Sequence, residues 1–90
     1  MRRIVLVEWY DATGGEITGW RDLEDVQSMR PTFARTVGYL VYEGTIPDTK
    51  MNYVVVCPHI VGRKHPQGDG ELAIPKSWIK RIITLRTETE

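Results

Sequence analysis

Short apolar runs alternate along the chain with polar segments that contain glycine or proline, and this pattern is typical of a mainly β protein. Five runs rich in β-branched and aromatic residues predict strands, over 3–9, 36–43, 53–61, 71–74 and 79–86. The third run should break or bulge at Pro58, because proline has no backbone N–H to donate to a strand ladder. The segments 10–19, 44–52 and 62–70 read as loops.

A short helix is predicted in the first long connection, over 22–30. Asp22 can cap its start, Leu23 and Val26 fall on one face, and Pro31 ends it. Because so short a helix is not stable alone in water, we expect it to pack on the sheet.

The segment before the last predicted strand is the most informative about the fold. Ile74 ends one strand, Pro75 stops the ladder, and 76–78 leaves room for a single 3₁₀ turn, which Ser77 is expected to cap. Five strands, a helix in the first long loop and a 3₁₀ turn before the last strand predict a five-stranded SH3-like barrel. A partly open sheet with one packed helix is the alternative. An OB-fold is less favoured, because its helix usually lies between the third and fourth strands.

Length and charge limit the possible functions. Ninety residues indicate one domain, over 1–86, with a short acidic tail at 87–90. The formal charge is zero, which argues against bulk binding to nucleic acid or to anionic membranes and makes self-association plausible. Lys80 and Arg81 are expected to form an exposed, charged strand face.

The lone cysteine and the N-terminus favour the cytoplasm. Cys57 cannot form an intramolecular disulfide and is expected to be a small buried hydrophobe in a reducing compartment. The apolar run 4–7 is too short for a signal peptide or a membrane span.

No arrangement in the sequence points to catalysis. His59 and His65 have no nucleophile near them in sequence, and Ser28 and Ser77 lie in no nucleophile-elbow context. No metal-binding spacing, phosphate loop or dinucleotide fingerprint is present. We therefore expect no enzymatic activity, no metal and no cofactor.

Two groups of residues are candidates for ligand binding. Trp9, Tyr10 and Trp20 flank the glycine-containing first loop and could line a cleft, although the plainer interpretation is that the two tryptophans hold this loop on the barrel. A second group lies in and near the loop 62–70, where basic side chains could hold a phosphate or simply form a solvated hairpin tip. Its members are Arg63, Lys64 and His65, with Arg35 as a weaker addition.

A set of motifs spread over nearly the whole chain carries a resemblance. The motifs are Val7-x-Trp9-x-Asp11, Gly19-Trp20, Thr36-Val37-Gly38-Tyr39-Leu40-Val41 and Ile74-Pro75-Lys76-x-x-Ile79. In this pattern the chain resembles a group of small accessory proteins encoded by tailed bacteriophages. The resemblance implies a protein of the host bacterial cytoplasm that works by binding, since some such proteins block a defence enzyme and others are oligomeric sponges for a cyclic nucleotide signal.

These observations lead to one functional hypothesis and its alternatives. We expect a homo-oligomer that counters host defence by holding a nucleotide at a subunit interface. The aromatic group (Trp9, Tyr10, Trp20) would wall the base, and the basic group (Arg63, Lys64, His65, with Arg35) would hold phosphate. The alternatives are an adaptor or inhibitor that binds a host protein through a Trp9/Trp20 face, and a minor component of virion assembly.

Overall fold

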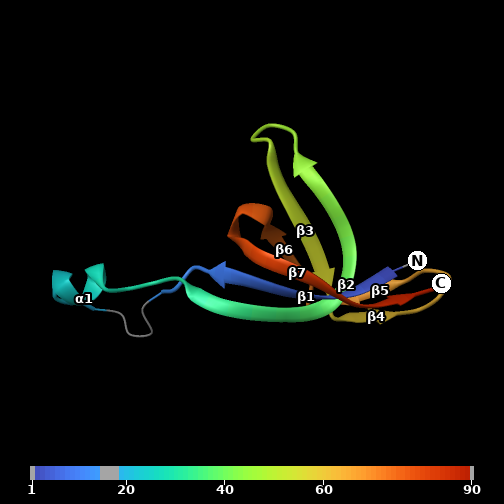
Figure 1. The fold of residues 1–90 in the computed structure, drawn as a ribbon, viewed down its shortest axis with the longest axis horizontal. Helices are drawn as coiled ribbons and strands as arrows, with labels where there is room; N and C mark the ends of the chain where they lie inside the picture. Colours follow the sequence, from blue (N-terminus) through green and yellow to red (C-terminus); the bar gives the residue numbers. More distant parts are fainter. Residues whose placement is uncertain (1, 15–18, 90) are drawn as a thin grey trace.

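The computed structural model describes residues 2–14 and 19–89, in which a mainly β architecture is confirmed (Figure 1). Five antiparallel strands form one sheet in the order β6-β3-β2-β1-β7. They are β1 (Arg2–Asp11), β2 (Thr32–Ile46), β3 (Met51–Cys57), β6 (Leu72–Pro75) and β7 (Ile79–Glu88). A separate two-stranded hairpin consists of β4 (His59–Val61) and β5 (Gln67–Asp69), and the helical segments are α1 (Leu23–Gln27) and the 3₁₀ turn η1 (Lys76–Trp78).

The core lies on one face of β1, β2 and β7. Alternate residues of β1 (Val5, Val7 and Trp9) are buried there, as the period of two in a strand requires. They belong to one cluster with Val54 and Val56 of β3 and Ile74 of β6. Because β3 and β6 do not pair with β1, this cluster can form only if the sheet folds back on itself.

Gly38 lies where β2 makes this bend. A Cβ atom at this position would come within 2.9 Å of both the backbone oxygen of Cys57 and Cγ1 of Val56. The register between β2 and β3 shifts a little further on, between Leu40 and Tyr42. A β-bulge of this kind increases local bending. Gly38 and the bulge together therefore allow one long strand to pair with β1 in one half of the folded sheet and with β3 in the other.

The folded sheet is not closed into a barrel. Among the described residues, the edge strands β6 and β7 pair with β3 and β1 respectively and not with each other. The expected SH3-like barrel is therefore not confirmed. The alternative prediction was a partly open sheet with one packed helix, and the structure agrees with its open sheet.

Most strand predictions hold, with corrected bounds. The break at Pro58 is confirmed, and η1 occupies the expected position before the last strand. β2 is longer than predicted because it pairs first with β1 and then with β3. The predicted loop 62–70 contains β5, which pairs with β4. Ser77 does not cap η1, whose N-cap residue is Pro75 without a side-chain hydrogen bond.

The predicted acidic tail is largely part of the sheet. Glu88 pairs with Arg2, and Thr87 pairs with Arg3, so β7 continues into the segment predicted to be a tail outside the domain. Glu90 lies outside the described residues. The physical reason is that β1 begins at Arg2 and offers a partner for each of these positions.

The helix prediction is wrong in its bounds, its cap and its packing. α1 ends at Gln27, and the Asp22 side chain makes no capping hydrogen bond; instead, the Asp22 carbonyl accepts hydrogen bonds from the backbone N–H groups of Asp25 and Val26. Every residue from 19 to 33 is exposed, and α1 lies well beyond the end of β1 (Figure 1). The expected loop 10–19 starts too early, because Tyr10 and Asp11 belong to β1; residues 12–14 and 19 lie outside helices and strands, and 15–18 lies outside the described residues.

The molecule is consequently extended. Its radius of gyration is 16.6 Å and its dimensions are 54 × 27 × 23 Å, whereas a compact chain of this length has a radius of gyration of about 12 Å. Three parts project from the sheet: the segment with α1, the β2–β3 hairpin tip and the β4–β5 hairpin (Figure 1). Such projections leave much surface available for contacts.

Candidate functional site

The three candidate aromatic residues do not form a common wall. Trp9 is 7% exposed and belongs to the core, where its indole Nε1 donates a hydrogen bond of 3.0 Å to Oγ1 of Thr36. Tyr10 follows it in β1 and therefore points to the opposite face, where its ring meets Phe33 edge-on at 5.5 Å. Trp20 is fully exposed, away from both. Trp9 thus acts as a core residue, and no Trp9/Trp20 face exists in one chain.

The candidate basic residues of the loop 62–70 lie at the other end of the molecule. Arg63, Lys64 and His65 are exposed at the tip that joins β4 to β5. Arg63 contributes to a cleft of about 770 Å³ that Arg2 also lines. Arg2 and Tyr10 are eight residues apart on β1, which corresponds to about 26 Å. Within one chain, the structure therefore does not bring the basic loop and the aromatic residues together.

The cleft beside the basic loop has mixed electrostatics. Glu88 lines it together with the two arginines, and the hydroxyl of Tyr39 donates a 3.4 Å hydrogen bond to Oε2 of Glu88. The carboxylate places a negative charge where an anion would bind. The cleft is large enough for a small organic molecule, but its mixture of positive and negative side chains does not favour a phosphate over other ligands.

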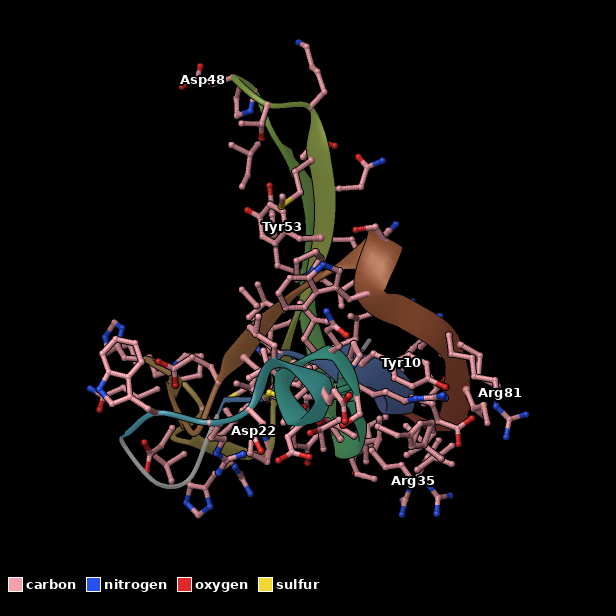
Figure 2. The ribbon with its side chains drawn as sticks, turned by 90° about the vertical axis from the view of Figure 1, so that its left-hand side faces the viewer. Tyr10, Asp22, Arg35, Asp48, Tyr53 and Arg81 are labelled. Carbon is pink, nitrogen blue, oxygen red and sulfur yellow. The ribbon has the colours of Figure 1, made fainter. Side chains whose placement is uncertain are left out.

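Arg35 belongs to a charged cluster that the sequence analysis did not identify. In the strand register, Glu8 of β1 lies between Arg35 of β2 and Arg81 of β7. Nε of Arg81 donates a hydrogen bond to Glu8, and Nε of Arg35 lies 3.6 Å from Oε2 of the same carboxylate. Arg35 and Arg81 extend to the same side of the ribbon (Figure 2). Arg81 is thus an ion-pair partner as well as an exposed charge.

The arginines also determine the protonation of Glu8. The hydrogen bond from Arg81 is the main cause that lowers the pKa of Glu8; burial opposes the shift, and the charges of Arg81, Arg35 and Lys80 reinforce it. Glu8 therefore remains an anion and has no role as a proton donor near neutral pH. The lone acidic residue within the apolar run of β1 was the sequence signal for this cluster, but its partners depend on strand register.

The cysteine and the two histidines considered for catalysis differ in their exposure to solvent. Cys57 is buried as expected, 3% exposed, with its Sγ 3.2 Å from the carbonyl oxygen of His59. His59 and His65 are exposed. Within residues 2–14 and 19–89, no three His, Cys, Asp or Glu side chains are grouped as metal ligands would be.

The most unusual surface lies on residues 19–31, which we call the arm. Four large apolar side chains recur on it every three residues and are exposed to water. They are Trp20 (103% exposed), Leu23 (72%), Val26 (43%) and Met29 (40%). Sequence reasoning identified the apolar face of the helix but assigned it to the core, because a helix with such a face usually packs against its own domain.

Comparisons with protein-family models, with curated proteins and with solved structures found no match. None of the helices in the described segments has the length and apolar character needed to cross a bilayer.

Proposed function

We propose that this protein is a non-enzymatic binding protein that uses the arm to hold another protein. The exposure of the arm carries this proposal. A helix of five residues is not stable alone in water, and its side chains make no core contacts within the described chain. A protein partner that covers Leu23, Val26 and Trp20 would supply the missing packing.

The five-stranded sheet supports the assignment of an SH3-like fold, which is part of this proposal. The first strand lies between the second and the last, a long first connection carries α1, and η1 directly precedes β7. These are features of SH3-like domains, which commonly serve as binding modules. We propose an open variant of that fold, in which the first connection has become a projecting contact element.

An affinity pull-down tests the arm proposal, with the full wild-type chain and a Leu23→Glu/Val26→Glu variant as separate baits. The cells also produce a second copy of the wild-type chain with a different tag, so that a second copy can be recognised among the retained proteins. Both substitutions lie on exposed positions outside the sheet, so the fold should be retained. We expect the wild type to retain at least one protein that the variant loses, with identification by mass spectrometry. Equal retention by both baits would contradict the proposed role of the arm.

Nucleotide sequestration by a phage accessory protein is the second candidate, and the cleft beside the basic loop favours it. Arg2 and Arg63 both line this cleft, and arginine is well suited to phosphate. Because the aromatic residues lie elsewhere in the chain, stacking by Trp20 would have to come from another copy. This version therefore needs an oligomer, and the phage origin and the role against host defence rest on the resemblance of the motifs alone.

Native mass spectrometry with a panel of linear and cyclic nucleotides tests this second candidate. If it is right, the wild type retains a nucleotide of unchanged mass, and an Arg63→Ala/Lys64→Ala variant does not, because the phosphate loses two of its cationic partners and Arg2 alone remains in the cleft. Lys50→Ala, at the exposed β2–β3 tip, serves as a control for the loss of positive charge. Unchanged retention in the double variant would exclude the basic loop as a phosphate site. A host protein bound without nucleotide would favour the adaptor or inhibitor alternative, and presence in purified virions would favour the assembly alternative.

A further inference from the structure

The identity of the protein that covers the arm can be inferred from a second apolar surface on the same chain. The sheet face opposite the core, which we call the outer face, borders the β4–β5 hairpin at Tyr39, where both line one cleft, and carries a row of accessible apolar side chains nearer its middle. Leu6 of β1 lies in register between Val37 of β2 and Ile83 of β7. Val37 is 51% exposed, and the other two are partly exposed. This row of side chains offers an apolar strip across three strands.

Charged residues next to this strip complement the charge of the arm. The neighbouring row contains Glu8 between Arg35 and Arg81, and Nζ of Lys80 lies 5.9 Å from the centre of the Phe33 ring on the same face. Three cations and one anion leave this part of the outer face positive. The arm carries three acidic side chains, all within 22–27, and two basic ones, Arg21 and Arg30, on either side of them. The acidic, apolar centre of the arm therefore matches a basic, apolar face in both respects.

The arm does not reach the outer face of its own chain. It leaves the sheet at the ends of β1 and β2 and extends beyond them, away from the strands that form that face (Figure 1). All its residues are exposed accordingly. The two complementary surfaces of one chain can therefore meet only between copies.

The exposed area of the chain is large enough for such contacts. The accessible surface is 7374 Å², whereas a monomer of 10.4 kDa typically exposes about 5,400 Å². The excess of about 2,000 Å² is about two and a half times what one partner contributes to a standard interface of about 1,600 Å² in total. An excess of this size leaves room for two contacts per chain, one through its arm and one through its outer face, beside the surface of the other projecting parts.

We infer that the arm of one copy docks on the outer face of a second copy, and that the reverse contact forms at the same time. Leu23 and Val26 cover the strip around Val37, and the acidic residues of the arm face Arg35 and Lys80. The contact is two-fold symmetric, as in most homodimers. The formal charge of zero leaves little net repulsion between copies. This inference rests on the proposed function, because it names the partner of the arm.

Sedimentation velocity of the purified full chain over a range of concentrations tests the inference. We expect the wild type to be a dimer and Leu23→Glu/Val26→Glu to weaken association by about 100-fold or more, because two apolar side chains lose their burial. Val37→Glu should weaken it by at least about tenfold on the same grounds. Val61→Glu is the matched control, since Val61 is 52% exposed in a strand of the separate β4–β5 hairpin; it should leave association unchanged.

Mixing the two disruptive variants tests the arm-on-face geometry directly. The arm variant keeps an intact outer face, and the Val37→Glu variant keeps an intact arm. One of the two contacts can therefore form in the mixture, and we expect a 1:1 complex that neither variant forms alone. Circular dichroism of each variant verifies that the sheet is retained.

Three results would overturn the inference: a wild type that stays monomeric, an oligomer that the arm variant does not disturb, or a mixture without a complex. A monomeric wild type that still retains a foreign protein through the arm would remove the second copy as partner and leave the proposed function in place. Absence of any arm-dependent partner would remove both.

Discussion

Replacing Ile74 with alanine tests whether the open sheet folds back on itself as described. Ile74 is 1% exposed and reaches the core from β6, an edge strand that pairs only with β3 in the described sheet. The substitution removes three buried carbons, for which transfer to water costs about 2.4 kcal/mol. The residual cavity adds to this cost, for a total of about 3–4 kcal/mol.

This loss is large for so small a protein. A chain of this length has a total free energy of unfolding of about 5–14 kcal/mol, and each kcal/mol shifts the melting temperature of a small domain by about 4–8 °C. We expect a decrease of roughly 12 °C or more in the melting temperature and a clearly lower urea midpoint.

Urea denaturation followed by circular dichroism measures the effect. All samples need the same protein concentration, because association also stabilises the folded state. Leu72→Ala is the control, since Leu72 lies on the same strand but is 41% exposed; it should cost about 1 kcal/mol. Similar losses for the two variants would refute the argument, because they would mean that β6 does not cover the face of β1.

Two further predictions concern the glycines of β2 and the buried carboxylate. Gly38→Ala should destabilise the fold by about 1–3 kcal/mol, because its Cβ would meet a backbone oxygen at 2.9 Å. At Gly44 the atoms nearest to an added Cβ belong to the far end of the exposed Tyr42 side chain, which can move aside, so Gly44→Ala should be nearly neutral. Urea denaturation measures both variants, and equal costs would contradict this reasoning. The pKa of Glu8 is lowered from its ordinary value of 4.5, first by the hydrogen bond from Arg81, so its stabilisation is complete above that value and is lost as the pH falls through the lowered pKa. Thermal unfolding across the acid range should therefore show a flatter pH dependence for Glu8→Gln than for the wild type, and identical slopes would argue against this ion pair.

The sequence predicted the parts of the fold that depend on local chemistry. Runs of β-branched residues predicted the strands. Pro58 predicted the break after Cys57, and Pro75 predicted the turn before β7. Closure of the sheet could not be predicted in this way. It depends on whether the edge strands β6 and β7, which are close in the sequence but lie at opposite edges of the sheet, pair with each other in space, and no local pattern specifies this.

The candidate site was predictable only in part, for two physical reasons. Trp9 and Tyr10 are neighbours in the sequence but point to opposite faces of β1, so their proximity in the chain did not mean a shared surface. The apolar face of α1 was recognised, but the pattern that marks a face for burial is the same whether the cover is the same chain or another. The ion-pair partners of Glu8 are determined by the register of β1 with β2 and β7, and the sequence alone does not specify this register.

The position of β1 in the sheet has a consequence for synthesis of the protein. β1 is the first strand, yet one of its two neighbours is β7, the last strand in the described chain. During translation, β1 and β2 can form a hairpin early, but the second edge of β1, with the run Ile4-Val5-Leu6-Val7, stays unpaired until β7 has left the ribosome. An unpaired apolar edge of this kind is prone to intermolecular pairing. Nascent chains that stall before β7 should therefore be the form of this protein that depends most on chaperones.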